Sequence, residues 1–96
     1  VGMTQAPLTS LARGETVRIT VSNDTAFPHA MHLHGMHFAE VLGDGTLGPL
    51  RDTILINPRD TREIAFQAHN PGDWLFHCHM LAHHQGGMGT WVRVRG

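Results

Sequence analysis

Turn-forming residues divide this chain into segments that are too short for long helices. Its 96 residues include 11 glycines and 5 prolines. No stretch repeats apolar residues at the helical spacing i, i+3, i+4, i+7 for three turns. Apolar and polar residues alternate instead, as in residues 16–23, where Val17, Ile19 and Val21 share one face. The sequence therefore predicts a fold built from short strands.

Six segments carry a strand pattern, and turn residues separate them. They are residues 16–23, 36–42, 53–56, 62–68, 74–78 and 90–95. The turns include Gly43-Asp44-Gly45 and the Asn-Pro-Gly-Asp run at residues 70–73. Six or so short strands at such intervals predict an all-β fold, an antiparallel sandwich or barrel. Because the chain has no internal repeat or linker, we expect residues 1–96 to form a single domain.

Composition and charge exclude several classes of partner. Seven arginines, no lysine and eight acidic residues give a formal net charge of −1, which does not suit a strongly basic nucleic-acid binder. No apolar run reaches the roughly 18 residues of a membrane span. Residues 1–10 lack the charged and apolar regions of a signal peptide. We therefore expect no nucleic-acid partner, no membrane partner and no signal peptide in this chain.

Histidine is the compositional outlier, because eight of the nine histidines lie in two clusters. The first is residues 29–37 (HAMHLHGMH), and the second is residues 77–88 (HCHMLAHHQGGM), which holds the single cysteine. Imidazole, thiolate and thioether together favour copper, since two histidines, one cysteine and a weak axial methionine describe a blue-copper site. Zinc is the main alternative, but structural zinc sites usually have two or more cysteines.

The strand period divides the candidate ligands between two sites. In an extended segment Cys78 points to one face, while His77 and His79 point to the other. A copper held by Cys78 therefore lies inside the domain. His32 and His34 are two residues apart and likewise share a face. These four histidines are expected to converge on a second site, which is joined to the first through the backbone at Cys78.

Both clusters resemble the copper signatures of the multicopper oxidases, in particular those of their last cupredoxin domain. The matching segments are His29-Ala-Met-His32-Leu-His34-Gly and His77-Cys78-His79-x₃-His83-x₄-Met88. Residues 72–76 (GDWLF) and 51–53 (RDT) also match. The resemblance covers roughly residues 13–94, and it implies a cupredoxin-like Greek-key β-sandwich and a laccase-like oxidoreductase.

The first copper site implied by the resemblance is a type 1 centre. Cys78, His29 and His83 would hold its copper, and Met88 would be the weak axial ligand. A small reducing substrate would give single electrons to this centre. Since the family is usually exported, the resemblance also implies an extracytoplasmic location, either periplasmic or secreted.

The second implied site is half of a trinuclear cluster. His32 would bind a type 2 copper, and His34, His77 and His79 would bind type 3 coppers. His77, Cys78 and His79 would be the catalytic residues, because they carry electrons from the type 1 centre to the cluster. There O₂ would be reduced to water.

The family's cluster uses eight histidines from two domains, whereas this chain supplies four. If two copies bring the same histidine face together, their interface is isologous and two-fold. We therefore expect a homo-oligomer, a two-fold dimer or a D3 hexamer. Each chain would hold one type 1 copper, and the type 2 and type 3 coppers would be shared between chains.

Two other functions remain open at this point. One is a mononuclear blue-copper electron-transfer domain, isolated or excised from an oxidase and inactive alone, although such a carrier has no use for His77 and His79. The other is a copper-storage or copper-resistance protein. A nitrite-reducing copper protein is disfavoured, because its type 2 site needs only one histidine beside the cysteine. His37, His69 and His84 fall outside the ligand spacing.

Overall fold

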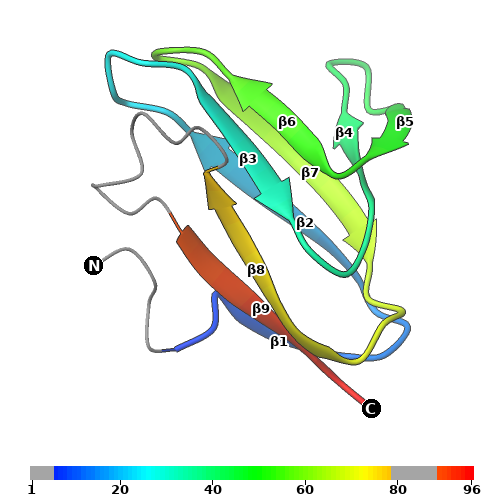
Figure 1. Ribbon diagram of the computed structural model, residues 1–96. Coiled ribbons are helices and arrows are strands. Elements are labelled where there is room, and N and C mark those ends of the chain that lie inside the picture. Colours follow the sequence, from blue (N-terminus) through cyan, green and yellow to red (C-terminus); the bar gives the residue numbers. More distant parts are fainter. Residues whose placement is uncertain (1–5, 79–88) are drawn as a thin grey trace.

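The structure, a computed structural model, describes residues 6–78 and 89–96, which form two sheets (Figure 1). The five-stranded sheet has the order β1 (Thr9–Ala12), β9 (Gly89–Arg95), β8 (Gly72–Cys78), β3 (His29–Leu33) and β6 (Thr53–Ile56). The four-stranded sheet has the order β2 (Thr16–Ser22), β7 (Thr61–Gln67), β4 (Phe38–Val41) and β5 (Leu47–Arg51). The described residues contain no helix, and the expected β-sandwich is confirmed.

The described residues contain nine strands, so the expectation of six or so was too low. The additional strands are β1, β3 and β5. Gly48 and Pro49 argue against a strand in the sequence, but β5 is the last strand of its sheet, where proline is tolerated. Strand β1 has only four residues and pairs with β9 in parallel, which departs from the antiparallel expectation.

Five of the six expected strands have bounds that differ from the sequence-based expectation, and the differences are largest for β8 and β4. Strand β8 begins at Gly72, two residues before the expected start at Trp74, because Gly72 and Asp73 already pair with β9. Strand β4 is confined to Phe38–Val41, within the broader run expected at residues 36–42. The single-domain expectation for residues 1–96 stays a prediction.

Apolar side chains that alternate with polar ones along the strands form the core between the two sheets. In β9, Val92 and Val94 are buried and Arg93 and Arg95 are exposed, as their alternation predicts. The largest fully buried side chains come from both sheets: Phe38, Leu33, Ile54, Ile56, Ile64 and Val92. Among the described residues, no helix is long and apolar enough to cross a membrane.

Strands β3 and β8 lie side by side at the centre of the five-stranded sheet (Figure 1). They pair antiparallel, with Met31 opposite Cys78 and His32 opposite His77. Since neighbouring residues of a strand point to opposite faces, this register puts Met31 and Cys78 on the inner face. It puts His32 and His77 on the outer face.

Candidate metal centre

The inner face of the β3–β8 pair brings His29 and Cys78 together. Both side chains are buried, with His29 4% exposed and Cys78 8% exposed. The Nδ1 atom of His29 lies 3.2 Å from the Sγ atom of Cys78. An imidazole nitrogen and a soft sulfur thus face each other in a nearly dry environment, although 49 residues separate them in sequence.

The second ring nitrogen of His29 also has a partner. Its Nε2 atom lies 2.9 Å from Oγ1 of Thr25, which in turn contacts Oδ1 of Asn23 at 2.6 Å. Neither Thr25 nor Asn23 was singled out from the sequence. The available signal was the Asn-Asp-Thr run at residues 23–25, which predicts a local turn but not a contact with the histidine.

The outer face gathers His32, His34 and His77. The ring centroids of His32 and His34 are 4.7 Å apart, those of His34 and His77 are 5.1 Å apart, and those of His32 and His77 are 5.7 Å apart. The Nε2 atoms of His34 and His77 lie 3.0 Å apart. All three side chains are half-buried. The shared face expected from their spacing is therefore present for these three residues.

Backbone carbonyls orient two of these imidazoles, and the Nδ1 atom of His77 lies 3.1 Å from the carbonyl oxygen of Cys78. The Nδ1 atom of His32 lies 3.1 Å from the carbonyl oxygen of Asp52 and 3.0 Å from Oγ1 of Thr53. A carbonyl oxygen only accepts hydrogen bonds, so Nδ1 of His32 donates, and Nε2 carries the lone pair of the neutral ring. Such a hydrogen bond on the far nitrogen is typical of metal-binding histidines.

A tight contact with Trp74 holds the turn that follows His34. Gly35 has φ = 85°, and a Cβ atom placed on it would lie 2.2 Å from the Trp74 ring. Asn70 Nδ2 donates to the Gly35 carbonyl at 3.0 Å, and Trp74 Nε1 donates to the Asn70 carbonyl at 2.8 Å. The indole therefore packs flat against a position where only glycine fits, and this packing fixes the backbone beside His34.

A bidentate ion pair lies on the same outer face, between β8 and β9. The guanidinium of Arg93 donates to both carboxylate oxygens of Asp73, at 2.9 Å and 3.2 Å. These hydrogen bonds, more than the attraction between the charges, hold the pKa of Asp73 below its ordinary value. Arg93 also stacks on the ring of Trp91, 5.0 Å from its centroid. Both charged groups are about half exposed, so solvent screens the pair.

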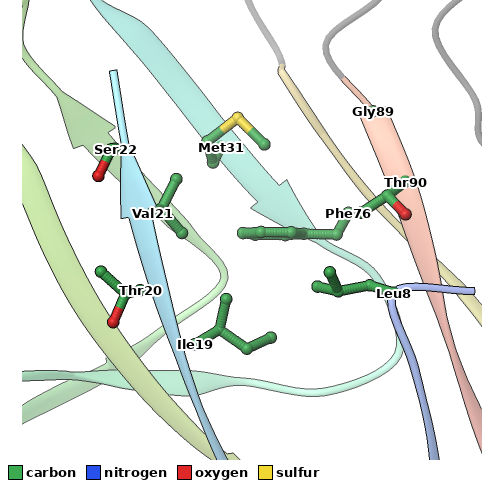
Figure 2. A pocket seen from close by; sticks show the side chains of 9 residues that line it. All are labelled: Leu8, Ile19, Thr20, Val21, Ser22, Met31, Phe76, Gly89 and Thr90. Carbon is green, nitrogen blue, oxygen red and sulfur yellow. The ribbon is translucent and has the colours of Figure 1, made fainter. Parts of the chain in front are cut away.

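A cavity of about 340 Å³ opens between β2 and the five-stranded sheet (Figure 2). Its apolar lining comes from Leu8, Ile19, Val21, Met31 and Phe76. No titratable side chain lines it among the described residues, and the polar side chains of its lining are those of Thr20, Ser22 and Thr90. Met31 is 7% exposed and belongs to the hydrophobic core, in agreement with a packing role.

A family model described as "Multicopper oxidase" matches residues 2–96 of the chain. The chain belongs to the multicopper oxidase family. Because the match runs through both histidine clusters and the fold is a β-sandwich, it is a cupredoxin-like domain of a multicopper oxidase. Membership implies copper as the cofactor and oxidoreductase chemistry at the level of the family.

Known proteins support this assignment of the multicopper oxidase domain. Lac15 from a marine microbial metagenome has a crystal structure that superposes with a TM-score of 0.86, at 54% identity over 98% of this chain and 24% of that one. McoA from Aquifex aeolicus gives a TM-score of 0.80 at 32% identity, over 95% of this chain and 22% of its own. Multicopper oxidase MmcO from Mycobacterium tuberculosis is 35% identical over 80% of this chain and 15% of its own length. The domain thus spans about one seventh of the curated relatives it matches.

The described residues of the multicopper oxidase domain fit copper by the chemistry of their donors. They supply one buried thiol beside an imidazole and three clustered imidazoles, the soft and borderline donors that copper prefers. Within residues 6–78 and 89–96, no three His, Cys, Asp or Glu side chains converge closely enough to hold a metal ion by themselves. The other expected ligands, His79, His83 and Met88, lie outside the described residues, as does His84. His37 and His69 are exposed.

Proposed function

We propose that this domain binds a type 1 copper on its inner face and half of a trinuclear copper cluster on its outer face. The observation that carries the proposal is the β3–β8 register, because Cys78 shares the inner face with His29 while His77 shares the outer face with His32. Two adjacent residues of one strand thus serve two sites on opposite sides of one sheet. A carrier with a single copper does not need the outer set.

The inner residues Cys78 and His29 would hold the type 1 copper together with His83 and Met88. When bound, copper supplies one-electron redox chemistry, which the side chains alone lack. The sheet contributes position and dryness, because Cys78 and His29 are buried and their donor atoms already face each other at 3.2 Å. In this proposal a small reducing substrate gives single electrons to the inner site, and His77, Cys78 and His79 link it to the outer site.

The outer residues His32, His34, His77 and His79 would contribute one type 2 ligand and three type 3 ligands to a cluster that reduces O₂ to water. One domain supplies half of such a set. Exposed apolar side chains on the same outer face support an interface there, since Leu55 is 49% exposed and Leu75 is 42% exposed. We propose that a second copy of this face completes the cluster, in a two-fold dimer or a D3 hexamer.

Enzyme activity in this proposal depends on that assembly, since neither half-cluster holds the complete ligand set. The type 1 copper belongs to each chain, and the type 2 and type 3 coppers are shared between chains. An extracytoplasmic location completes the proposal, on the strength of the family resemblance.

Copper stoichiometry and oligomeric mass, measured on one sample, test this proposal. A symmetric pair of chains is expected to bind about five coppers, of which two are type 1 and three are shared. The mass should be that of a dimer or hexamer, and turnover with O₂ should follow the assembled fraction. A monomer that binds one copper overturns the assembly and favours the alternative, a blue-copper electron-transfer domain that is inactive alone.

A further inference from the structure

Thr25 and Asn23 form a hydrogen-bonded chain behind His29, on the side of the ring that faces away from Cys78. We propose that these two residues are positioning residues that fix the tautomer of His29. They place the hydrogen on Nε2 and leave the lone pair of Nδ1 directed at Cys78. This inference rests on the proposed type 1 site, and it assigns a role to residues that are not themselves ligands.

The side chain of Asn23 is held in one orientation. It is 4% exposed, and its Nδ2 atom lies 2.7 Å from the Phe27 carbonyl and 2.9 Å from the Ile56 carbonyl. Carbonyl oxygens only accept, so both amide hydrogens are used and the other amide atom must be the oxygen. That oxygen, Oδ1, accepts from the backbone N–H of Thr25 at 3.0 Å.

The position of the hydroxyl hydrogen of Thr25 follows from this. Its Oγ1 lies only 2.6 Å from Oδ1 of Asn23. Two oxygens this close need a hydrogen between them, and Oδ1 has none to give, so the hydroxyl of Thr25 donates to it. Without that hydrogen, two sets of oxygen lone pairs would repel each other in a half-buried site.

His29 must therefore donate to Thr25. Oγ1 of Thr25 lies 2.6 Å from Oδ1 of Asn23 and 3.0 Å from the Phe27 carbonyl, and both of these oxygens only accept, so its one hydrogen is directed to their side. The Nε2 atom of His29 lies 2.9 Å from the same Oγ1, which therefore accepts from Nε2–H. A neutral imidazole carries one ring hydrogen, and Nδ1 is then left with its lone pair 3.2 Å from Sγ of Cys78. The opposite tautomer would direct an N–H at the copper site.

The chain that orients His29 is anchored in the fold. The backbone N–H of Asn23 donates to the Asp60 carbonyl at 2.9 Å, and the backbone N–H of Arg59 donates to the Asn23 carbonyl at 2.7 Å. The loop between β6 and β7 thereby holds the residue that orients Thr25. Outer-shell partners of this kind typically contribute about 10- to 100-fold to metal affinity.

The test compares Thr25→Val, which keeps the shape and removes the hydroxyl, with Thr25→Ser, which keeps the hydroxyl. Thr20→Val on the exposed face of β2 is the matched control. Nitrogen-15 NMR of the metal-free, full 96-residue chain reports which nitrogen of His29 carries the hydrogen. Competition with a chelator of known affinity reports copper binding.

We expect a single Nε2–H tautomer in the wild type, Thr25→Ser and Thr20→Val. In Thr25→Val we expect a mixture of tautomers and copper binding weakened by about 10-fold or more.

The outcomes separate this inference from the proposed function. If the wild type carries the hydrogen on Nδ1, the inference is wrong whatever the variants do, even if Thr25→Val fails to fold. If Thr25→Val keeps both the tautomer and the copper affinity of the wild type, the inference is also wrong. If the tautomers change as expected but the wild type binds no copper through Cys78, the orientation of His29 stands and the type 1 assignment fails.

Discussion

The two faces of the β3–β8 strand pair differ in how deeply the chain buries their side chains. On the inner face His29 and Cys78 are at most 8% exposed, and each ring nitrogen of His29 has a partner within the domain. On the outer face, by contrast, His34 and His77 are half-buried and contact each other through their Nε2 atoms. The inner pair is oriented by the core, and the outer set is left accessible to another surface.

The difference arises from a single step along the backbone. Cys78 and His77 are neighbours on β8, yet strand alternation sends them to opposite sides of the sheet. Burial therefore protects the thiol without covering the imidazole. A β-strand is well suited to joining two such sites, because no helix places adjacent residues on opposite faces so strictly.

Removing a ligand from one face should leave the other face intact, and this gives the largest expected effects. We expect Cys78→Ser to abolish the intense blue absorption completely, because the chromophore needs the thiolate, while the outer histidines still bind metal. We expect His34→Ala to do the reverse, since His34 lies on the outer face and is not adjacent to Cys78. Copper titrations followed by visible absorption and electron paramagnetic resonance distinguish the two losses.

A blue colour that survives Cys78→Ser would show that the type 1 assignment is wrong. Loss of outer-face binding in that variant, with an unchanged circular dichroism spectrum, would show that the two faces are not independent. Either result would contradict the expectation that the two faces hold two independent copper sites.

The division of the cysteine and histidine side chains between the faces was predictable from sequence, because it depends only on local properties. A strand period of two separates Cys78 from His77, and donor chemistry points to copper whatever the rest of the fold is. The orienting contacts were not predictable, since they join distant segments. Asn23 reaches the carbonyl of Ile56, 33 residues away, and no pattern near Asn23 signals that contact.

The prediction of strands is limited in the same way, because local patterns do not report pairing between distant segments. Strand β9 was predicted because Val92 and Val94 alternate with arginines, and burial of both valines confirms it. Strand β5 was missed because Pro49 disfavours a strand unless the strand lies at the end of a sheet, and its place in the sheet depends on pairing with β4. Strand alternation therefore predicted the faces of Cys78 and His77 better than local patterns predicted the number of strands.

The packing that holds the outer face can be tested at two glycines with nearly equal backbone angles. Gly35 has φ = 85° and Gly45 has φ = 86°, but a Cβ atom added at Gly35 would meet the Trp74 ring, whereas one added at Gly45 would meet nothing within 4 Å. We expect Gly45→Ala to lower the free energy of unfolding by about 1 kcal/mol, from backbone strain alone. We expect Gly35→Ala to lower it by about 3 kcal/mol or more, because the methyl group also displaces the indole. Chemical denaturation measures both.

Gly35→Ala should also weaken metal binding on the outer face, since His34 precedes this turn, while the inner site keeps its absorption. Equal losses of stability in the two variants would mean that contact with Trp74 does not hold the turn. Trp74 fluorescence gives a second reading, because only Gly35→Ala should change the environment of that ring.

The smallest effect is expected from the ion pair between Asp73 and Arg93, on the exposed side of β8 and β9. Hydrogen bonds from Arg93 lower the pKa of Asp73, so the stability that this pair adds is present above the unfolded-state pKa of the carboxyl. That stability is lost as pH falls through the lower folded-state pKa. We expect Asp73→Asn to lower Tm by at most a few degrees at pH 7, because solvent screens the pair. The difference from wild type should disappear in strong acid, where Asp73 is protonated in both states.

Asp24→Asn removes the same charge from another exposed position and serves as the control. A large loss at pH 7, or one that persists in acid, would mean that Asp73 stabilises the outer face by contacts other than its charge.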